Sequence, residues 1–162
     1  MGKLSKMRTN LLNMSSNKDW SDAKTEWKLD YVYKAKVKTH CLCGSYPLQK
    51  LYVMKNTNTG LIIKVGASCA KHIIKDYDVD KIFPALKALN ANKIYKLHSL
   101  VDMFYFKGLL SETDKHFYHD MRQFSVKKEY INPNQKYKLN HMIKTITNIV
   151  NDLVEQYDLI KQ

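Results

Sequence analysis

The stretches that decide the fold are Cys41-Leu42-Cys43-Gly44 and, after a gap, Cys69-Ala70-Lys71-His72. These two stretches contain all three cysteines of the chain, and 25 residues separate Cys43 from Cys69. Tetrahedral zinc takes four nitrogen or sulfur ligands. A tight turn would supply two, and the first turn of a helix would supply two more, because residues at i and i+3 share one helical face. The spacing therefore predicts a zinc site made by Cys41, Cys43, Cys69 and His72, with Gly44 providing the backbone freedom that the turn requires.

Two alternatives to this ligand set stay open. His40 is an alternative metal ligand, because His40-x-x-Cys43 has the commoner two-residue spacing whereas Cys41-x-Cys43 has only one spacer. It could equally orient a ligand through a hydrogen bond. The second alternative is three buried thiols without any metal, since free cysteine packs as a small apolar residue.

The residues between the two cysteine stretches have the pattern of a hairpin. Residues 48–55 are rich in apolar side chains, Asn56-Thr57-Asn58-Thr59-Gly60 is a turn sequence, and residues 61–65 are mostly β-branched. Before the first cysteine, an alternating pattern from Tyr31 predicts a half-buried strand with three lysines on its outer face. The inward residues would be Tyr33, Ala35 and Val37, and the outward ones Lys34, Lys36 and Lys38. The order knuckle, hairpin, helix resembles a treble-clef zinc finger.

The flanking sequence completes an α+β fold. Residues 1–18 show no clear period and start basic, which predicts a flexible arm. Trp20, Ala23 and Trp27 fall at helical spacing, which predicts a helix over 20–30, and a further helix is expected over 69–77. Beyond Asp78 the sequence favours helices at about 80–89, 92–107, 112–124 and 136–160. We thus expect a flexible basic arm (1–18), a zinc-finger-like module (19–77) and a helical bundle region (78–162).

The last helix has a seven-residue repeat. Its two interleaved series are Leu139, Ile146, Leu153 and Ile160, and Ile143, Val150 and Tyr157. Met142, Ile149 and Val154 widen the apolar stripe, which favours packing against the chain's own helices. Self-association through residues 136–160 is the alternative.

Charge indicates a polyanionic partner. Lys and Arg number 27 against 15 Asp and Glu, a net charge of +12, and residues 31–75 hold eight lysines and no acidic residue. Only Arg8 and Arg122 are arginines, so few bidentate base contacts are available and binding to DNA or RNA should be largely independent of sequence. A solvated lysine surface without a ligand is the alternative. The candidate nucleic-acid-binding residues are Lys34, Lys36, Lys38, Lys50, Lys55, Lys64 and Lys71.

Catalytic and membrane patterns are not found in the sequence. No paired carboxylates, phosphate-binding loop or catalytic triad is recognisable, so we expect a binding protein and not an enzyme. The longest apolar runs are only a few residues, as in Leu61-Ile62-Ile63, and we expect no secretory signal, membrane span or membrane partner. Three cysteines without a signal peptide are expected to be reduced thiols in an intracellular compartment.

The motif Cys41-x-Cys43-Gly44 … Asn56-x-x-Thr59-Gly60 … Val65-Gly66-x-x-Cys69, preceded by the Trp20 to Trp27 segment, resembles small zinc modules in uncharacterised proteins of large DNA viruses and bacteriophages. The resemblance covers about residues 20–75. It implies a zinc-finger-like element in a viral or phage protein, which would place the chain in the host cytoplasm or nucleus. An alternative function follows: an effector that binds and modulates a host protein through its helical half, with the zinc module as scaffold.

Overall fold

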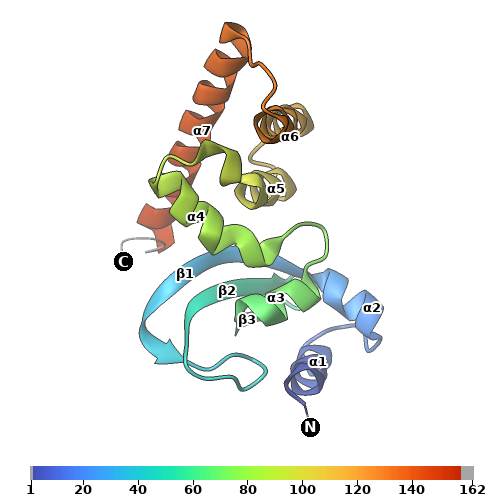
Figure 1. Cartoon of the computed structure of the whole chain (residues 1–162). Coiled ribbons are helices and arrows are strands. Elements are labelled where there is room, and N and C mark those ends of the chain that lie inside the picture. Colours follow the sequence, from blue (N-terminus) through green and yellow to red (C-terminus); the bar gives the residue numbers. More distant parts are fainter. Residues whose placement is uncertain (1, 158–162) are drawn as a thin grey trace. The chain divides into compact units, whose positions relative to one another are not determined.

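The computed structural model describes the backbone of residues 2–157 and the side chains of residues 2–153. It is mixed α+β, as predicted, with a three-stranded antiparallel sheet and seven α-helices in the described residues (Figure 1). The chain forms two compact units, the first ending at Asp80 and the second running from Lys81 to Asp152.

The sheet belongs to the first unit. Its strands are β1 (Trp27–Thr39), β2 (Leu48–Asn56) and β3 (Ile62–Val65), in the order β1-β2-β3. The predicted hairpin is confirmed as the β2–β3 pair. Its turn is held by the Asn56 side-chain oxygen, which accepts hydrogen bonds from the backbone N–H groups of Asn58 and Thr59, both at 2.8 Å. Gly60 closes the turn with φ +74°, a conformation that favours glycine.

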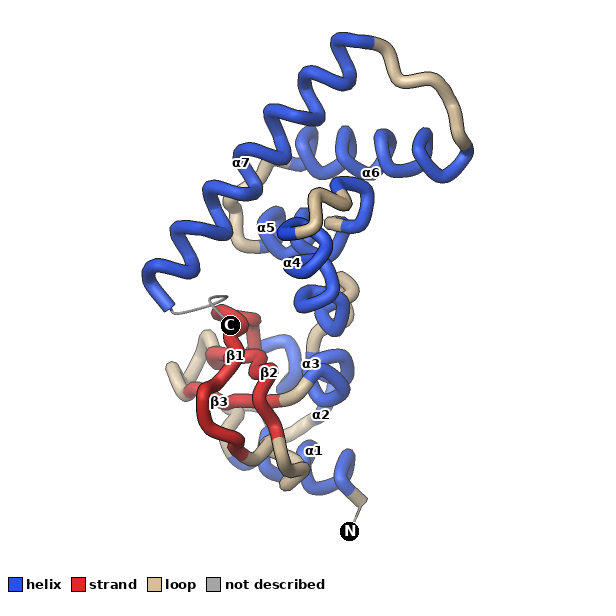
Figure 2. The backbone as a smooth tube through the Cα atoms, turned by 60° about the vertical axis from the view of Figure 1, so that its left-hand side comes forward, coloured by secondary structure: helices blue, strands red, loops and turns tan. Residues whose placement is uncertain are grey.

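One face of the sheet carries most of its buried side chains, and Leu51 and Val53 of β2 are buried on the other face. An irregularity in the β1–β2 register between Leu29 and Tyr31 adds a residue to β1, so Trp27, Leu29 and Val32 all lie on the same face. The pairing adds four buried residues of β2 and β3 to that face: Tyr52, Met54, Ile63 and Val65. Helices α1, α2 and α3 lie along one side of the strands, as Figure 2 shows. The side chain that joins this face to the amino-terminal segment is Trp27, whose Nε1 donates to Ser15 Oγ at 2.8 Å.

The expected helix over 20–30 is wrong beyond its first turns. Helix α2 covers only Trp20–Ala23, a 3₁₀ turn follows at Lys24–Glu26, and β1 begins at Trp27. Trp27 sits opposite Asn56 in the ladder and its indole is 1% exposed, so pairing and burial in the sheet outweigh the helical spacing of the two tryptophans. Trp20 is half-buried, and the Arg8 guanidinium lies over its ring, 4.8 Å from the ring centre.

The expected flexible arm over residues 1–18 is also wrong, because Lys3–Asn13 forms helix α1. Met7 and Leu11 are both 0% exposed, so the helix is anchored by two apolar side chains at i and i+4 spacing. With Leu4 they form an apolar stripe that was present in the sequence. Three of the four basic residues of 1–18, namely Lys3, Lys6 and Arg8, occupy exposed positions of the same helix.

The first unit ends with helix α3 (Ala67–Ile73), shorter than the expected 69–77. A 3₁₀ turn at Val79–Lys81 leads to α4 (Ile82–Asn90), and a second one at Ile94–Lys96 leads to α5 (His98–Phe106). α5 starts later than the expected residue 92 because Asn92, with φ +56°, interrupts the helical backbone. Then follow α6 (Glu112–Lys127) and α7 (Pro133–Tyr157), which with α4 and α5 confirm a helical second half.

Within the second unit, α5 and α6 lie side by side, and α7 runs crosswise to them (Figure 1). Tyr118 of α6 is fully buried, and its hydroxyl accepts from Leu97 N–H at 2.7 Å and donates to the Ile94 carbonyl at 2.8 Å. Among the described residues of α7, the buried side chains form one stripe: Leu139, Met142, Ile146 and Val150. Ile160 and the Tyr157 side chain lie outside the described part, and self-association through 136–160 stays a prediction. No helix in residues 2–157 combines the length and apolar character needed to cross a membrane.

Candidate metal centre

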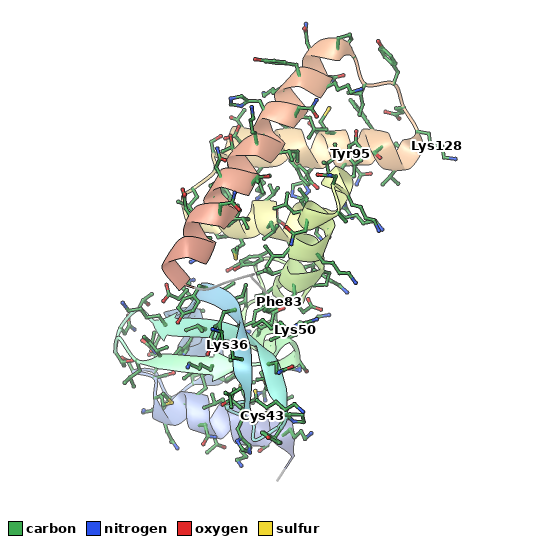
Figure 3. The ribbon with its side chains drawn as sticks, turned by 90° about the vertical axis from the view of Figure 1, so that its left-hand side faces the viewer. Lys36, Cys43, Lys50, Phe83, Tyr95 and Lys128 are labelled. Carbon is green, nitrogen blue, oxygen red and sulfur yellow. The ribbon has the colours of Figure 1, made fainter. Side chains whose placement is uncertain are left out.

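The three cysteines come together, as their spacing predicted. Cys41 and Cys43 lie in the turn between β1 and β2, and Cys69 lies in α3. All three side chains are buried and their Sγ atoms lie within 4.8 Å of one another. Figure 3 labels Cys43 at the end of the β1–β2 ladder that is nearest to α1. Among the described residues, they are the one group of three or more histidine, cysteine or acidic side chains close enough to hold a metal ion.

The turn that carries Cys41 and Cys43 is fixed by its own backbone. Cys41 N–H donates to the Ser45 carbonyl at 2.9 Å, and Gly44 N–H donates to the Cys41 carbonyl at 2.8 Å. Gly44 has φ +86°, which confirms that the position demands an unusual backbone conformation. The side chains of Cys41 and Cys43 thus project from this hydrogen-bonded turn towards the same side.

The donor chemistry fits a metal that prefers sulfur. The Sγ atoms of Cys41 and Cys69 are 3.6 Å apart, and sulfurs at about 2.3 Å from a tetrahedral zinc ion would be about 3.8 Å apart. The cysteines are free thiols. Gly66 N–H points at Cys41 Sγ from 3.3 Å, and the Ser45 hydroxyl lies 3.2 Å from Cys43 Sγ, so both sulfurs have a hydrogen-bonding neighbour. Such neighbours hold metal thiolates in position.

One of the thiols is prepared for ionisation. The hydrogen bond between the two sulfurs, helped by the N–H groups of Cys43 and Gly66 and opposed by burial, lowers the pKa of Cys41. The same hydrogen bond and burial raise the pKa of Cys69. Because thiolates are the metal-binding form, the site already favours one ligand in its ionised state.

The two candidate histidines do not join the cysteines. His72 is exposed on α3 and is not part of the group, although it follows Cys69 by three residues. His40 is also exposed, and its ring stacks on Tyr46 with 4.5 Å between the ring centres. The described residues thus supply three sulfur ligands. Neither histidine completes the set in this structure.

Helix α1 supports the cysteine turn, which the sequence analysis missed. Asn10 Nδ2 donates to the Leu42 carbonyl at 3.0 Å. The Lys6 ammonium lies 2.9 Å from the point that a Cβ atom on Gly44 would occupy, so Lys6 covers the turn where it has no side chain. Lys6 and Asn10 are four residues apart and share one face of α1, and this spacing was the available signal.

The seven candidate lysines are all exposed, but they do not form one face. Lys34 lies opposite Lys50 across the β1–β2 ladder, on the same face as the core. Lys55 and Lys64 lie on the other face, since Lys55 pairs with Lys28 and Lys64 pairs with Val53. The alternation expected from Tyr31 onward is wrong at Val37, which is 78% exposed. Val37 lies in a second register irregularity, between Lys34 and Thr39, where five steps along β1 correspond to two along β2, and a sequence period alone does not reveal such an irregularity.

Lys36 and Lys38 follow Lys34 towards the carboxy-terminal end of β1. Figure 3 labels Lys36 on the strand next to the one that carries Lys50. Lys71, on α3, forms a 3.5 Å ion pair with Asp80. We call the four lysines Lys34, Lys36, Lys38 and Lys50 the ladder lysines. They are the part of the predicted set that the sheet brings to one end of two neighbouring strands.

Comparison with protein-family models, with curated proteins and with solved structures gives no match.

Proposed function

We propose that this chain is a zinc-containing, viral or phage protein that binds nucleic acid without strong sequence preference and catalyses no reaction. Zinc would be held by Cys41, Cys43 and Cys69, with His72 or His40 reaching the fourth position after a side-chain rearrangement. The ladder lysines would contact phosphates. The three-thiol group supports the metal, and the arrangement of the lysines supports the polyanion.

The observation that carries the proposal is that lysine lies opposite lysine at two positions of the β1–β2 ladder. Lys34 lies opposite Lys50, and Lys28 lies opposite Lys55. Lysines placed directly opposite each other across two strands repel. A bound phosphate backbone would turn that repulsion into attraction.

Zinc would act on this surface through the backbone. Cys41 and Cys43 sit in the loop that joins β1 to β2, directly after the segment that carries Lys36 and Lys38. An ion that fastens this loop to Cys69 of α3 would hold the ends of both strands. The ladder lysines would then keep a fixed spacing, which lowers the entropy lost on binding.

A salt series on random-sequence nucleic acid tests the proposal. Replacing all four ladder lysines by Ala should reduce the slope of log K against log salt by about 3 to 4, because each phosphate contact contributes roughly 0.7 to 0.9. A matched variant removes the same charge at four exposed lysines elsewhere: Lys3, Lys75, Lys87 and Lys93. It should keep most of the slope. Equal losses in the two variants, or binding that ignores salt, would remove these lysines from the interface.

A second candidate function is an effector that binds a host protein through the helical unit. Three large apolar side chains there are exposed: Phe106 at 50%, Leu109 at 47% and Val126 at 68%. Exposed apolar groups of this size are compatible with a protein interface. This candidate is preferred if the salt series detects no binding to nucleic acid.

A further inference from the structure

The stretch from the second half of α6 to the last turns of α7 carries an excess of positive charge. Residues 121–151 contain six basic residues and one acidic residue, Glu129. The five lysines among them are all exposed, while Arg122 is half-buried. Figure 3 shows Lys128 directed away from the end of α6. The six basic residues are Arg122, Lys127, Lys128, Lys136, Lys138 and Lys144.

Two tyrosines lie within this basic region with their rings in solvent. Tyr130, in the segment between α6 and α7, is 80% exposed, and Tyr137, in the second turn of α7, is 76% exposed. The core tyrosines Tyr52 and Tyr118 are 1% and 0% exposed. Two aromatic rings that contribute this little to packing are available as contact surfaces.

Helix α7 arranges these groups along one ridge. Tyr137, His141 and Lys144 follow at i, i+4 and i+7, on the side of the helix opposite the buried Leu139 and Ile146. A shallow hollow of about 400 Å³ runs along this ridge. Its lining combines a ring, an ammonium group and hydrogen-bonding side chains: Tyr137, Asn140, His141, Ile143, Lys144 and Thr147.

We propose that this surface, which we call the α7 ridge, binds single-stranded nucleic acid. Unpaired bases expose faces that stack on tyrosine rings, whereas bases in a duplex are already stacked on one another. The lysines on either side would neutralise phosphates along the same strand. The inference goes beyond the proposed function, because the α7 ridge lies in the second unit and uses none of the metal ligands or ladder lysines.

Charge complementarity favours single-stranded nucleic acid over an uncharged, apolar partner at the α7 ridge. Apart from Glu129, every charged residue from 121 to 151 is basic. The surface of the hollow is mostly apolar, as base stacking requires, and five of its six lining residues also carry a polar group. An acidic protein segment would satisfy the lysines but not the two exposed rings. Stacking is therefore the property that the experiment must isolate.

The test uses the full chain and a fluorescent oligo(dT) strand of about 20 nucleotides, with a duplex of the same length as comparison. Changing Tyr130 and Tyr137 to Leu keeps apolar bulk and removes stacking, whereas changing both to Phe keeps the ring. The Leu variant should bind oligo(dT) about tenfold or more weakly, and the Phe variant should stay within about twofold of the unchanged protein. Both positions are exposed, so thermal midpoints should agree among the three proteins.

Charge is tested separately on the same strand. Changing Lys128, Lys136 and Lys144 to Ala should lower the salt slope by about 2, since a single-stranded contact contributes about 0.7. Removing the exposed Lys87, Lys93 and Lys96 of the same unit is the matched control and should leave the slope nearly unchanged.

Three results would overturn the inference. The first is an equal effect of the Leu and Phe variants on oligo(dT) binding. The second is an equal loss of oligo(dT) and duplex binding in the Leu variant. The third is competition by polyglutamate as strong as competition by unlabelled oligo(dT), which would mark the ridge as a site for acidic protein segments. None of these variants alters the ladder lysines, so failure here leaves the first proposal to be judged by its own salt series.

Discussion

At the residue scale, Glu26 is a buried carboxylate that accepts four hydrogen bonds. It is 4% exposed and accepts from the backbone N–H groups of Ser16 at 2.9 Å and Asn17 at 2.7 Å. The side-chain amides of Asn17 and Asn56 each add a bond of 2.8 Å. One carboxylate thus ties the segment after α1 to the last residue of β2. Burial raises the pKa of Glu26, but these four bonds outweigh it and lower the pKa from 4.5 to about 2.

This carboxylate predicts an acid-sensitive step in stability. Because the folded pKa lies below the unfolded one, the stabilisation is complete above pH 4.5 and is lost as the pH falls towards 2. Glu26→Gln should be less stable than the unchanged protein at pH 7, and the difference should shrink between pH 4.5 and 2. Urea denaturation across this range measures it. Glu112→Gln, at a highly exposed glutamate of α6, is the control and should leave the pH profile as it was.

The contrast between Glu26 and the cysteines explains what a sequence reveals about single residues. Cysteine is rare in this chain, and clustering of all three at ligand spacing is informative by itself. Glu26 gave no such signal, since its partners are ordinary polar residues and one of them, Asn56, lies 30 positions away. His72 follows Cys69 at the expected spacing, and in this structure its side chain is exposed on α3 and outside the thiol group, so its role as a ligand stays a prediction.

At the element scale, α1 changes the account of the amino-terminal segment. Its two buried residues pack in the first unit, and its polar face holds the cysteine turn through Asn10 and Lys6. The prediction of a flexible arm rested on the basic residues of 1–18 and did not use the apolar stripe of Leu4, Met7 and Leu11. Long elements with strong local signals, such as α6 with its Ser111–Asp114 capping box, were recognised because their start is encoded locally.

Two matched substitutions test whether α1 is an integral part of the fold. Leu11→Ala should destabilise the protein by about 2 to 5 kcal/mol, because it removes a fully buried side chain. Leu4→Ala, the same change on the same helix at a residue 39% exposed, should cost clearly less. Denaturant titration of both variants gives the comparison. If this segment were instead a loose arm, neither substitution would change the free energy of unfolding.

At the scale of the whole molecule, positive charge is shared between the two units. Residues 1–80 contain 14 basic and 7 acidic residues, and residues 81–152 contain 12 and 6. The eight lysines of residues 31–75 are therefore only part of the positive charge available to a polyanion. Sequence patterns anticipated the α+β class, because the hydrophobic period changes from two to that of helices along the chain. They did not predict which lysines share a face, since that depends on two register irregularities in β1, at Leu29–Tyr31 and at Lys34–Thr39.

The central claim is that one metal ion joins the Cys41–Cys43 turn to α3, and X-ray absorption at the zinc edge of the purified full chain tests it most directly. We predict one zinc per chain, with a shell of three sulfur atoms at about 2.3 Å and one lighter nitrogen or oxygen ligand. Cys69→Ser should remove a sulfur from that shell. Protein that carries no zinc after purification and metal addition, or zinc surrounded only by nitrogen and oxygen, would contradict the claim.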